Sequence, residues 1–303
     1  MKLDRINIPS PTESLSYQYG EDKQVSFWMK RDDLIHPDIV GNKWRKISGY
    51  FDHFDTSDQK GIVTCGGPYS NHLLATAGAC ALYGIRCSGF IRGDYYKKEN
   101  DMIGRMRTLG MSIHFLSNQD FDQLNIDPAR ILSQYELHDS LFVPMGGQSS
   151  MGEVGCRAIV NEVIDAQLRP DIWLVAAGTS TTASGIIQQI NYPCEVWVYP
   201  AVDRKTNEIG ALKAGLSKLN DQVEVQIMNP HRCRFGKVDD ALVDFVDSFH
   251  RQTDILLDPL YNGKMMESFF SEYAGVLAER KVLAYHSGGM AGWSGFKLFT
   301  EMI

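Results

Sequence analysis

The sequence lacks the marks of several broad protein classes. Its six cysteines are scattered, with no C-x-x-C pair and no Cys/His spacing that suits zinc. Its longest mostly apolar stretch, residues 73–85, is too short to cross a bilayer. No apolar segment of the signal-peptide type stands near the first methionine. These absences predict reduced thiols, a cytoplasmic location, no metal and no membrane attachment.

An excess of basic charge is also missing. Lys and Arg number 30 against 37 Asp and Glu, which gives a formal net charge of −7. Nucleic-acid binding needs a basic face, so no nucleic-acid partner is expected. The hydrophobic fraction of 44% is ordinary for a globular protein, and 303 residues are enough for two domains. No repeat, charge block or low-complexity linker marks a boundary.

Short β-rich runs alternate with stretches of helical period along most of the chain. The runs cover residues 25–30, 61–65, 87–91, 112–116, 141–143, 172–176, 194–199, 224–227, 255–257 and 282–285. The helical stretches cover residues 73–83, 99–109, 154–166, 184–190, 242–250 and 265–277. This alternation predicts an α/β protein with mostly parallel, twisted sheets flanked by helices.

Glycines gather where four of the predicted strands end. They are Gly66 and Gly67, Gly146 and Gly147, Gly178, and Gly288 and Gly289. In open α/β sheets ligands bind beyond the carboxyl ends of the strands, so we expect these loops to converge on one small molecule. Each turn alone is equally explained by glycine closing a strand-to-helix connection.

The loop that starts at Gly178 is rich in small hydroxyl side chains. Thr179, Ser180, Thr181 and Thr182 follow an apolar run and precede a helical face. Backbone N–H groups at a helix start bind anions, and hydroxyls add donors. The loop has no lysine and no G-x-G-x-x-G, so a phosphomonoester fits better than a nucleotide. A plain Ser/Thr-rich helix cap is the open alternative.

Basic residues crowd the start of another predicted helix, in residues 41–46. Asn42 is the expected N-cap, and Lys43, Arg45 and Lys46 follow in the first turn. Cations there oppose the helix dipole, which makes sense beside an anion or an electrophile. Lys43 could form a Schiff base with an aldehyde if its pKa falls well below the usual value of about 10.4. A solvated basic helix start is the alternative.

Three further segments combine turns with polar side chains. Ser70 or Asn71 is expected to cap the helix of residues 73–83, where backbone N–H groups could hold a carboxylate. Asn71 could pair with a phenolate-type oxygen, whereas His72 at a helix start is more often structural. Tyr261 could transfer protons or contact a substrate. In the same reading, a ring nitrogen could be bonded by Asn262 or Ser287.

Taken together, these segments resemble a known enzyme family. The shared motifs are Lys30-Arg-Asp-Asp33, Gly41-Asn-Lys-x-Arg-Lys46, Gly66-Gly-x-x-Ser-Asn-His72, Gly178-Thr-x-Thr-Thr182, Asp258-Pro-x-Tyr-x-Gly-Lys264 and His286-x-Gly-Gly289. In this order they resemble pyridoxal-phosphate enzymes of the tryptophan-synthase-β-like fold (fold type II). More narrowly, they resemble the 1-aminocyclopropane-1-carboxylate deaminase / D-cysteine desulfhydrase family.

The resemblance implies roles for individual residues. Lys43 would carry pyridoxal 5'-phosphate, and Asn71 would bond its phenolic oxygen. The phosphate would lie on Gly178, Thr179, Ser180, Thr181 and Thr182. Ser70 would hold the substrate carboxylate, and Ser70 or Lys43 would take the α-proton. The other substrate contacts would be Asn71, Tyr69, His72 and Tyr261.

The resemblance also implies two domains and a homodimer. The larger domain would comprise residues 1–46 and 148–303 and bind the cofactor. The smaller domain, residues 47–147, would close over a small amino-acid substrate.

Five positions depart from the family pattern. They are Val40, Tyr69, Leu74, Phe235 and Asn262. Phe235 replaces a tyrosine important in the cyclopropane deaminases, and a neutral Asn262 or Ser287 would keep the cofactor a weak electron sink. We therefore expect β-elimination from D-cysteine, giving pyruvate, sulfide and ammonia. The alternatives are deamination of 1-aminocyclopropane-1-carboxylate, racemisation, a degenerate amino-acid-binding protein, or an α/β enzyme without pyridoxal phosphate.

Overall fold

The fold is taken from a computed structural model. It describes residues 6–21, 23–39, 41–93, 100–201, 205–228, 237–273 and 279–289. Among the sites named above, Val40 and Phe235 lie outside these ranges, as do the ends of the predicted helices at residue 99 and at residues 274–277.

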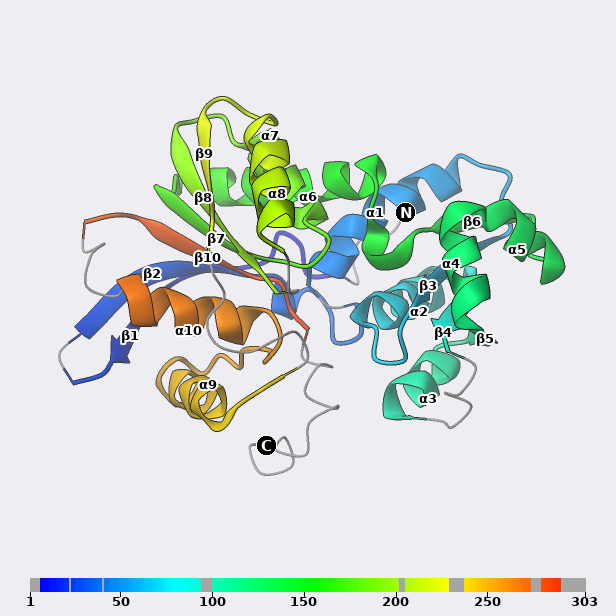
Figure 1. The fold of residues 1–303 in the computed structure, drawn as a ribbon, viewed down its shortest axis with the longest axis horizontal. Helices are drawn as coiled ribbons and strands as arrows, with labels where there is room; N and C mark the ends of the chain where they lie inside the picture. Colours follow the sequence, from blue (N-terminus) through cyan, green and yellow to red (C-terminus); the bar gives the residue numbers. More distant parts are fainter. Residues whose placement is uncertain are drawn as a thin grey trace.

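A six-stranded sheet forms the larger half of the molecule (Figure 1). Its strands are β1 (Thr12–Tyr19), β2 (Lys23–Arg31), β7 (Ile172–Ala177), β8 (Cys194–Pro200), β9 (Val223–Ile227) and β10 (Val282–His286). They lie in the order β1-β2-β10-β7-β8-β9, and only the edge pair of β1 and β2 is antiparallel. The carboxyl ends of the five parallel strands therefore share one edge.

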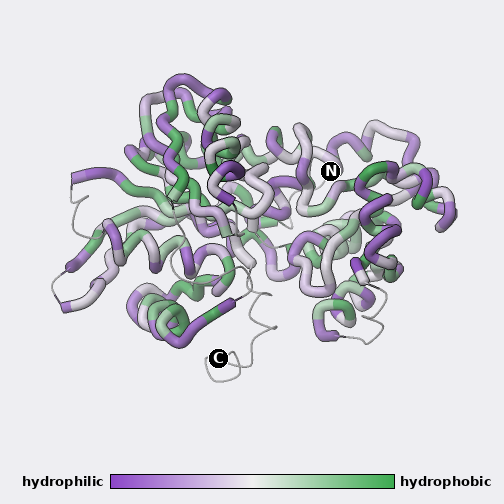
Figure 2. The backbone as a smooth tube through the Cα atoms, in the orientation of Figure 1, coloured by the Kyte–Doolittle hydropathy of each residue, from purple (hydrophilic) through white to green (hydrophobic). Residues whose placement is uncertain are grey.

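Helices cover both faces of this sheet. The helices α6 (Ser150–Asp165), α7 (Thr181–Gln189) and α8 (Thr206–Ser217) lie on one face, and α9 (Asp240–Thr253) and α10 (Asn262–Tyr273) lie on the other (Figure 1). All six residues of β7 are buried because both faces are covered. Its side chains alternate, so Leu174 packs with α9 and α10 whereas Trp173 packs with α6 and α7. Figure 2 shows hydrophobic residues along these inner strands and hydrophilic ones on the outer turns.

A four-stranded parallel sheet forms the smaller half, with the order β5-β4-β3-β6. Its strands are β3 (Gly61–Gly66), β4 (Arg86–Arg92), β5 (Met111–Leu116) and β6 (Ser140–Val143). One face packs against α1 (Asn42–Asp55), α2 (Asn71–Tyr83) and α3 (Asp101–Thr108). The other packs against α4 (Asn118–Ile126) and α5 (Pro128–Gln134). The α/β class and the parallel sheets are thus as predicted, and the proposed boundary after residue 46 falls inside α1.

The backbones of α1, α6 and α7 touch through glycines. A Cβ on Gly155 of α6 would lie 2.0 Å from the carbonyl oxygen of Arg45 in α1. A Cβ on Gly185 of α7 would lie 2.5 Å from the carbonyl oxygen of Glu153 in α6. No larger residue fits at either contact, so the start of α1 is held at a fixed distance from the start of α7.

Several local predictions were wrong. Ile255 and Leu257 are buried and Leu256 is partly buried, but these residues pair with none of the described strands, and the edge strand β1 was not predicted. The helices α4, α5 and α8 were also missed. The N-cap of α1 is Gly41, with φ 56°, rather than Asn42. Within the described ranges, no helix combines the length and the apolarity that a bilayer crossing needs.

Candidate active site

The side chain of Asn42 joins Lys43 to the hydroxyl-rich turn. Asn42 Nδ2 donates to Thr182 Oγ1 at 3.1 Å, and Asn42 Oδ1 accepts from Lys43 Nζ at 2.8 Å. The backbone N–H of Asn42 also donates to the carbonyl of Ser287 at 3.0 Å. The first turn of α1 therefore lies between the start of α7 and the end of β10. The residue expected to cap the helix instead ties three parts of the site together.

The Lys43 amine is prepared for nucleophilic attack. Burial, followed by the neighbouring Lys46 cation, lowers the pKa of Lys43 from 10.5 to about 7. Near neutral pH a large share of this amine is therefore unprotonated, which is the form that attacks a carbonyl carbon.

The turn before α7 forms a cradle for an anion. Ser180 has φ 64° and lies at the N-cap of α7, whose first N–H groups have no partner in the helix. Among the described residues, the buried Ser180 Oγ has no hydrogen-bond partner. Thr179 Oγ1 lies 3.1 Å from Thr181 Oγ1, so the hydroxyls of the turn are clustered. A buried hydroxyl with a spare donor at a helix start is suited to bind an anion.

Lys46 supplies positive charge to the cradle, which we did not predict. Its Nζ donates to Thr179 Oγ1 at 3.3 Å, and the side chain is buried. The i, i+3 spacing of Lys43 and Lys46 places both on one face of α1 and could have revealed this role. Arg45 points elsewhere and pairs with Asp32 and Glu162 at 2.9 and 2.5 Å. Only two of the three cations in this turn therefore serve the site.

The start of α2 forms the opposite wall. Ser70 caps this helix, as expected, and accepts from the backbone N–H of Leu73 at 3.3 Å. The amide oxygen of Asn71 is buried and has no hydrogen-bond partner among the residues that the structure describes. Tyr69 is 50% exposed. The wall therefore offers free helix N–H groups, one hydroxyl and one unpaired amide oxygen.

His72 is a neutral acceptor rather than an acid. Thr64 donates its hydroxyl hydrogen to the carbonyl of Val143 at 2.8 Å, so His72 Nε2, 2.7 Å away, donates to Thr64. Burial, and then the charges of Lys43 and Lys46, lower the pKa of His72 to about 3. Its buried Nδ1 has no hydrogen-bond partner within the part of the chain that the structure describes.

Tyr261 lies over the glycine that starts the anion cradle. A Cβ on Gly178 would lie 3.5 Å from Cε1 of the Tyr261 ring, which is ordinary van der Waals contact, so the ring packs directly beside this glycine. Burial, and then the charge of Asp258, raise the pKa of Tyr261 to about 12. The phenol is therefore protonated at neutral pH and can act as a hydrogen-bond donor.

The amide of Asn262 is fully used within its own loop. Its Nδ2 donates to Asp258 Oδ2, to the carbonyl of Gly288 at 3.0 Å and to Ser287 Oγ at 3.2 Å. Its Oδ1 accepts from the backbone N–H of Ser287 at 3.2 Å. The hydroxyl of Ser287 is therefore the better placed of the two expected partners for a ring nitrogen, since its hydrogen is not bonded to any described residue.

The glycine turns converge as predicted. A Cβ on Gly147 would lie 2.9 Å from Cβ of Lys46 and 3.7 Å from Cε1 of His72. A Cβ on Gly146 would lie 3.3 Å from Cγ2 of Thr179, and a Cβ on Gly289 would lie 3.5 Å from Nδ2 of Asn71. The segments that follow β3, β6, β7 and β10 therefore lie close to one another.

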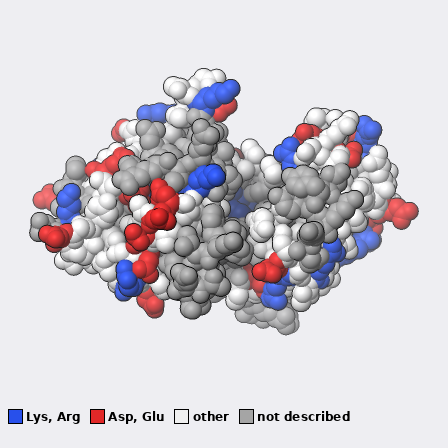
Figure 3. All heavy atoms as spheres, turned by 60° about the horizontal axis from the view of Figure 1, so that its bottom comes forward, with Lys and Arg blue, Asp and Glu red and all other residues white. Residues whose placement is uncertain are grey.

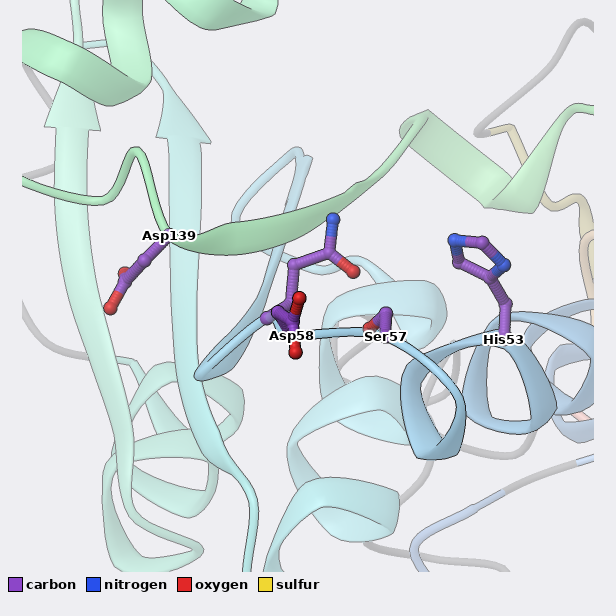
Figure 4. A pocket seen from close by; sticks show the side chains of 5 residues that line it. His53, Ser57, Asp58 and Asp139 are labelled. Carbon is purple, nitrogen blue, oxygen red and sulfur yellow. The ribbon is translucent and has the colours of Figure 1, made fainter.

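A separate hollow lies away from this cluster (Figure 4). It has a volume of about 300 Å³ and is bordered by His53, Ser57, Asp58, Gln59 and Asp139. None of the predicted site residues borders it. Across the described ranges, no group of three or more His, Cys, Asp or Glu side chains is placed to hold a metal ion. On the face drawn in Figure 3, acidic and basic side chains are interspersed rather than gathered in one patch.

Comparison with known proteins agrees with this geometry. The profile of the family described as pyridoxal-phosphate dependent enzyme matches residues 6–225. A bifunctional D-cysteine desulfhydrase/1-aminocyclopropane-1-carboxylate deaminase of Arabidopsis thaliana is 24% identical, over 94% of this chain and 77% of its own length. A D-cysteine desulfhydrase of Serratia proteamaculans is also 24% identical, over 95% of this chain and 93% of its own.

A solved structure shares the fold. The crystal structure of an ACC deaminase homologue superimposes with a TM-score of 0.77 at 20% identity, covering 98% of this chain and 94% of the other. These matches confirm the resemblance and the fold class inferred from the motifs. Because the family profile covers well over half of the sequence, the chain belongs to the pyridoxal-phosphate-dependent enzymes, with pyridoxal phosphate as cofactor.

Proposed function

We propose that this protein is a lyase or deaminase that acts on a small amino acid, with D-cysteine as the preferred substrate. The reaction would convert D-cysteine and water into pyruvate, sulfide and ammonia. The single observation on which the proposal rests is that a reactive lysine is linked by hydrogen bonds to the anion cradle. Lys43, with its pKa near 7, is linked through Asn42 to Thr182 at the start of α7.

The residues of the site fit the cofactor at both of its ends. Lys43 would bond its aldehyde carbon, and the residues from Gly178 to Thr182 together with Lys46 would hold its phosphate. The Ser180 Oγ, which has no hydrogen-bond partner among the described residues, is a buried donor that the phosphate would satisfy. The hydroxyl of Ser287 would face the ring nitrogen.

The bound cofactor would supply an electron sink for the bonds at the substrate α-carbon. The start of α2 would bind the substrate carboxylate through Ser70 and the free N–H groups of the first turn. Lys43, released as an amine, would take the α-proton. The protonated phenol of Tyr261 is suited to donate a hydrogen bond to the departing sulfur. Each of these tasks uses a group in the protonation state that its surroundings favour.

The neutral surroundings of the ring favour elimination over ring opening. Neither Ser287 nor Asn262 carries a charge that would keep the ring nitrogen protonated, so the electron sink is weaker than one with a carboxylate partner. A good leaving group on the β-carbon reduces the demand on that sink. Cysteine provides such a group, whereas the cyclopropane ring does not. Both substrates appear in the names of relatives, so they are the pair to compare.

The test compares Lys43→Ala with Lys60→Ala, a change at an exposed lysine outside the site. The wild-type protein and Lys60→Ala should be yellow and release sulfide from D-cysteine. Lys43→Ala should lose both the visible absorption band and at least 99% of turnover, since the linking amine is gone (about 10² or more in rate). Protein that stays colourless after incubation with pyridoxal phosphate would refute the proposal.

The choice of substrate has its own readout. Sulfide release from D-cysteine should be faster than 2-oxobutanoate release from 1-aminocyclopropane-1-carboxylate at equal concentrations. The reverse order would assign the protein to the deaminases. A yellow protein with no turnover of either compound would indicate a degenerate amino-acid-binding protein. A homodimer remains a prediction, which light scattering on the holoprotein would test.

A further inference from the structure

A buried histidine at the end of β10 has no part in the function proposed above. His286 is fully buried and directly precedes Ser287, the residue expected to face the ring nitrogen. Its Nε2 lies 3.1 Å from the carbonyl oxygen of Leu256. A carbonyl can only accept, so Nε2 must carry a hydrogen.

The other ring nitrogen holds the turn that contains Ser287. The backbone N–H of Gly288 donates to His286 Nδ1 at 3.1 Å, so Nδ1 must present a lone pair. The two contacts require the same tautomer, with the hydrogen on Nε2, which is assigned here from the partners. His286 therefore connects the turn to the chain at Leu256 with a donor on one side and an acceptor on the other.

A carboxylate near Nδ1 is occupied by another partner. Asp33 Oδ1 lies 3.6 Å from His286 Nδ1 and could compete for a hydrogen there. Arg31, however, donates to Asp33 through Nε at 2.9 Å and through Nη2 at 2.8 Å. Asp33 is thus bonded to Arg31, and Nδ1 is left to the Gly288 N–H.

The remaining polar groups of the turn are held by Asn42 and Asn262. The N–H of Ser287 donates to Asn262 Oδ1, and its carbonyl accepts from the N–H of Asn42. Ser287 Oγ accepts from Asn262 Nδ2 at 3.2 Å. Gly288 has φ 74°, which favours glycine and fixes the turn. Within the described contacts, the hydroxyl hydrogen of Ser287 is the group left for a ligand.

We propose that His286 is a positioning residue, which acts through the Gly288 N–H to aim the Ser287 hydroxyl at the cofactor ring. This inference rests on the proposed function. It assigns His286 Nδ1 the role of an acceptor that sets the orientation of Ser287. If the contact is lost, the Gly288 N–H needs another acceptor and the turn can move.

Two substitutions distinguish the roles of the two ring nitrogens of His286. His286→Asn keeps an acceptor near the Nδ1 position, and His286→Gln keeps a donor near the Nε2 position. Ser287→Ala serves as the reference for loss of the hydroxyl. For each protein, cofactor affinity is measured by fluorescence titration of the apoprotein, and the ¹⁵N resonance of ¹⁵N-labelled pyridoxal phosphate reports the bond to the ring nitrogen.

We expect His286→Gln to weaken cofactor binding about tenfold and to shift the ¹⁵N resonance toward that of Ser287→Ala (the scale of one hydrogen bond). His286→Asn should stay within about twofold of wild type, with an unchanged resonance. The proposal is overturned if His286→Gln matches wild type while Ser287→Ala does not. It is also overturned if both histidine variants lose affinity equally.

Wild-type measurements keep the proposal testable if the variants unfold. The ¹⁵N–¹H spectrum of the histidine rings must show His286 with its hydrogen on Nε2, and a hydrogen on Nδ1 contradicts the proposal. Failure of the proposed function looks different, because wild type would then bind no cofactor at all. If the wild type binds cofactor and both histidine variants bind it equally well, only this inference is contradicted and the proposed function is not.

Discussion

Lys43 carries the amine whose protonation should control cofactor capture. Because its pKa is lowered to about 7, the unprotonated share grows as the pH rises through neutrality. The rate at which the apoprotein captures pyridoxal phosphate should therefore rise between about pH 6 and 8 and then level off (one pH unit on either side of the midpoint spans most of a titration). Stopped-flow absorbance at a series of pH values measures this.

Lys46→Met tests the cause of that midpoint. Removing the Lys46 cation should raise the pKa of Lys43, because a like charge nearby disfavours the protonated amine. The midpoint of capture should then move to higher pH, and affinity for phosphate alone should fall. A midpoint that moves to lower pH would show that Lys46 acts on Lys43 in some other way.

At the scale of single residues, the sequence points to candidate chemical groups more readily than to their hydrogen-bond partners. Lys43 and the hydroxyls after Gly178 were selected as candidates because glycine, helix start and residue type coincide there. Lys46 was missed because its role depends on which face of α1 meets α7. Asn262 was expected to face a ring, yet its amide is bonded within the loop. Hydrogen-bond saturation of this kind depends on residues that are far away in sequence.

Among the helices, the contact between α1 and α6 should be intolerant of any side chain. Gly155→Ala would place a Cβ 2.0 Å from the carbonyl oxygen of Arg45 and 2.8 Å from Ser48 Oγ. Relief requires the two helices to separate, so we expect a loss of about 2–3 kcal/mol in the free energy of unfolding. Urea denaturation measures the loss, and cofactor affinity should fall with it.

Gly210→Ala is the matched control for that change. Gly210 lies on an exposed part of helix α8, and outside that helix's own backbone no described atom lies within 4 Å of its Cβ position. Alanine there should stabilise the protein by about 0.5–1 kcal/mol, since glycine is a poor helix former. Equal effects of the two substitutions would contradict the role given to close packing at Gly155.

Elements were predictable where burial imposes a pattern. The strand β7 reads as a continuous apolar run because helices cover both of its faces. The edge strand β1 was missed because five of its eight residues are Thr, Glu, Ser or Gln, and its signal is only the alternation of Leu15, Tyr17 and Tyr19. Residues 255–257 are apolar because they cross the core, and burial alone does not provide a strand partner.

A buried charge cluster connects distant parts of the whole molecule. Glu162 of α6 accepts from Lys30 of β2 and from Arg45 of α1, at 2.5 Å in each case. Asp32 accepts from Arg45 and from Tyr285 of β10. The two cations and two carboxylates balance, so the cluster is neutral as a unit. Through Arg45 the cluster holds the first turn of α1 to α6 and to the segment that follows β2.

Glu162→Gln should therefore destabilise the entire fold. The substitution leaves two buried cations with one carboxylate, and we expect a loss of about 3 kcal/mol in the free energy of unfolding. Asp247→Asn, which breaks an exposed pair with Arg251, should change it by less than about 0.5 kcal/mol. Denaturation curves for both variants settle the comparison, and similar losses would contradict the importance of the cluster.

The helix that bears Lys43 belongs to both halves at once. Its first residue bonds to Ser287 beside the larger sheet, and its apolar side packs with α2 in the smaller half. A helix is stiff, so a movement of the smaller half relative to the larger sheet would tilt α1 and displace the Lys43 amine with it. If the smaller half closes over the substrate, as the family resemblance implies, a substrate too large for closure would leave this amine out of position, and we therefore expect selection by substrate size.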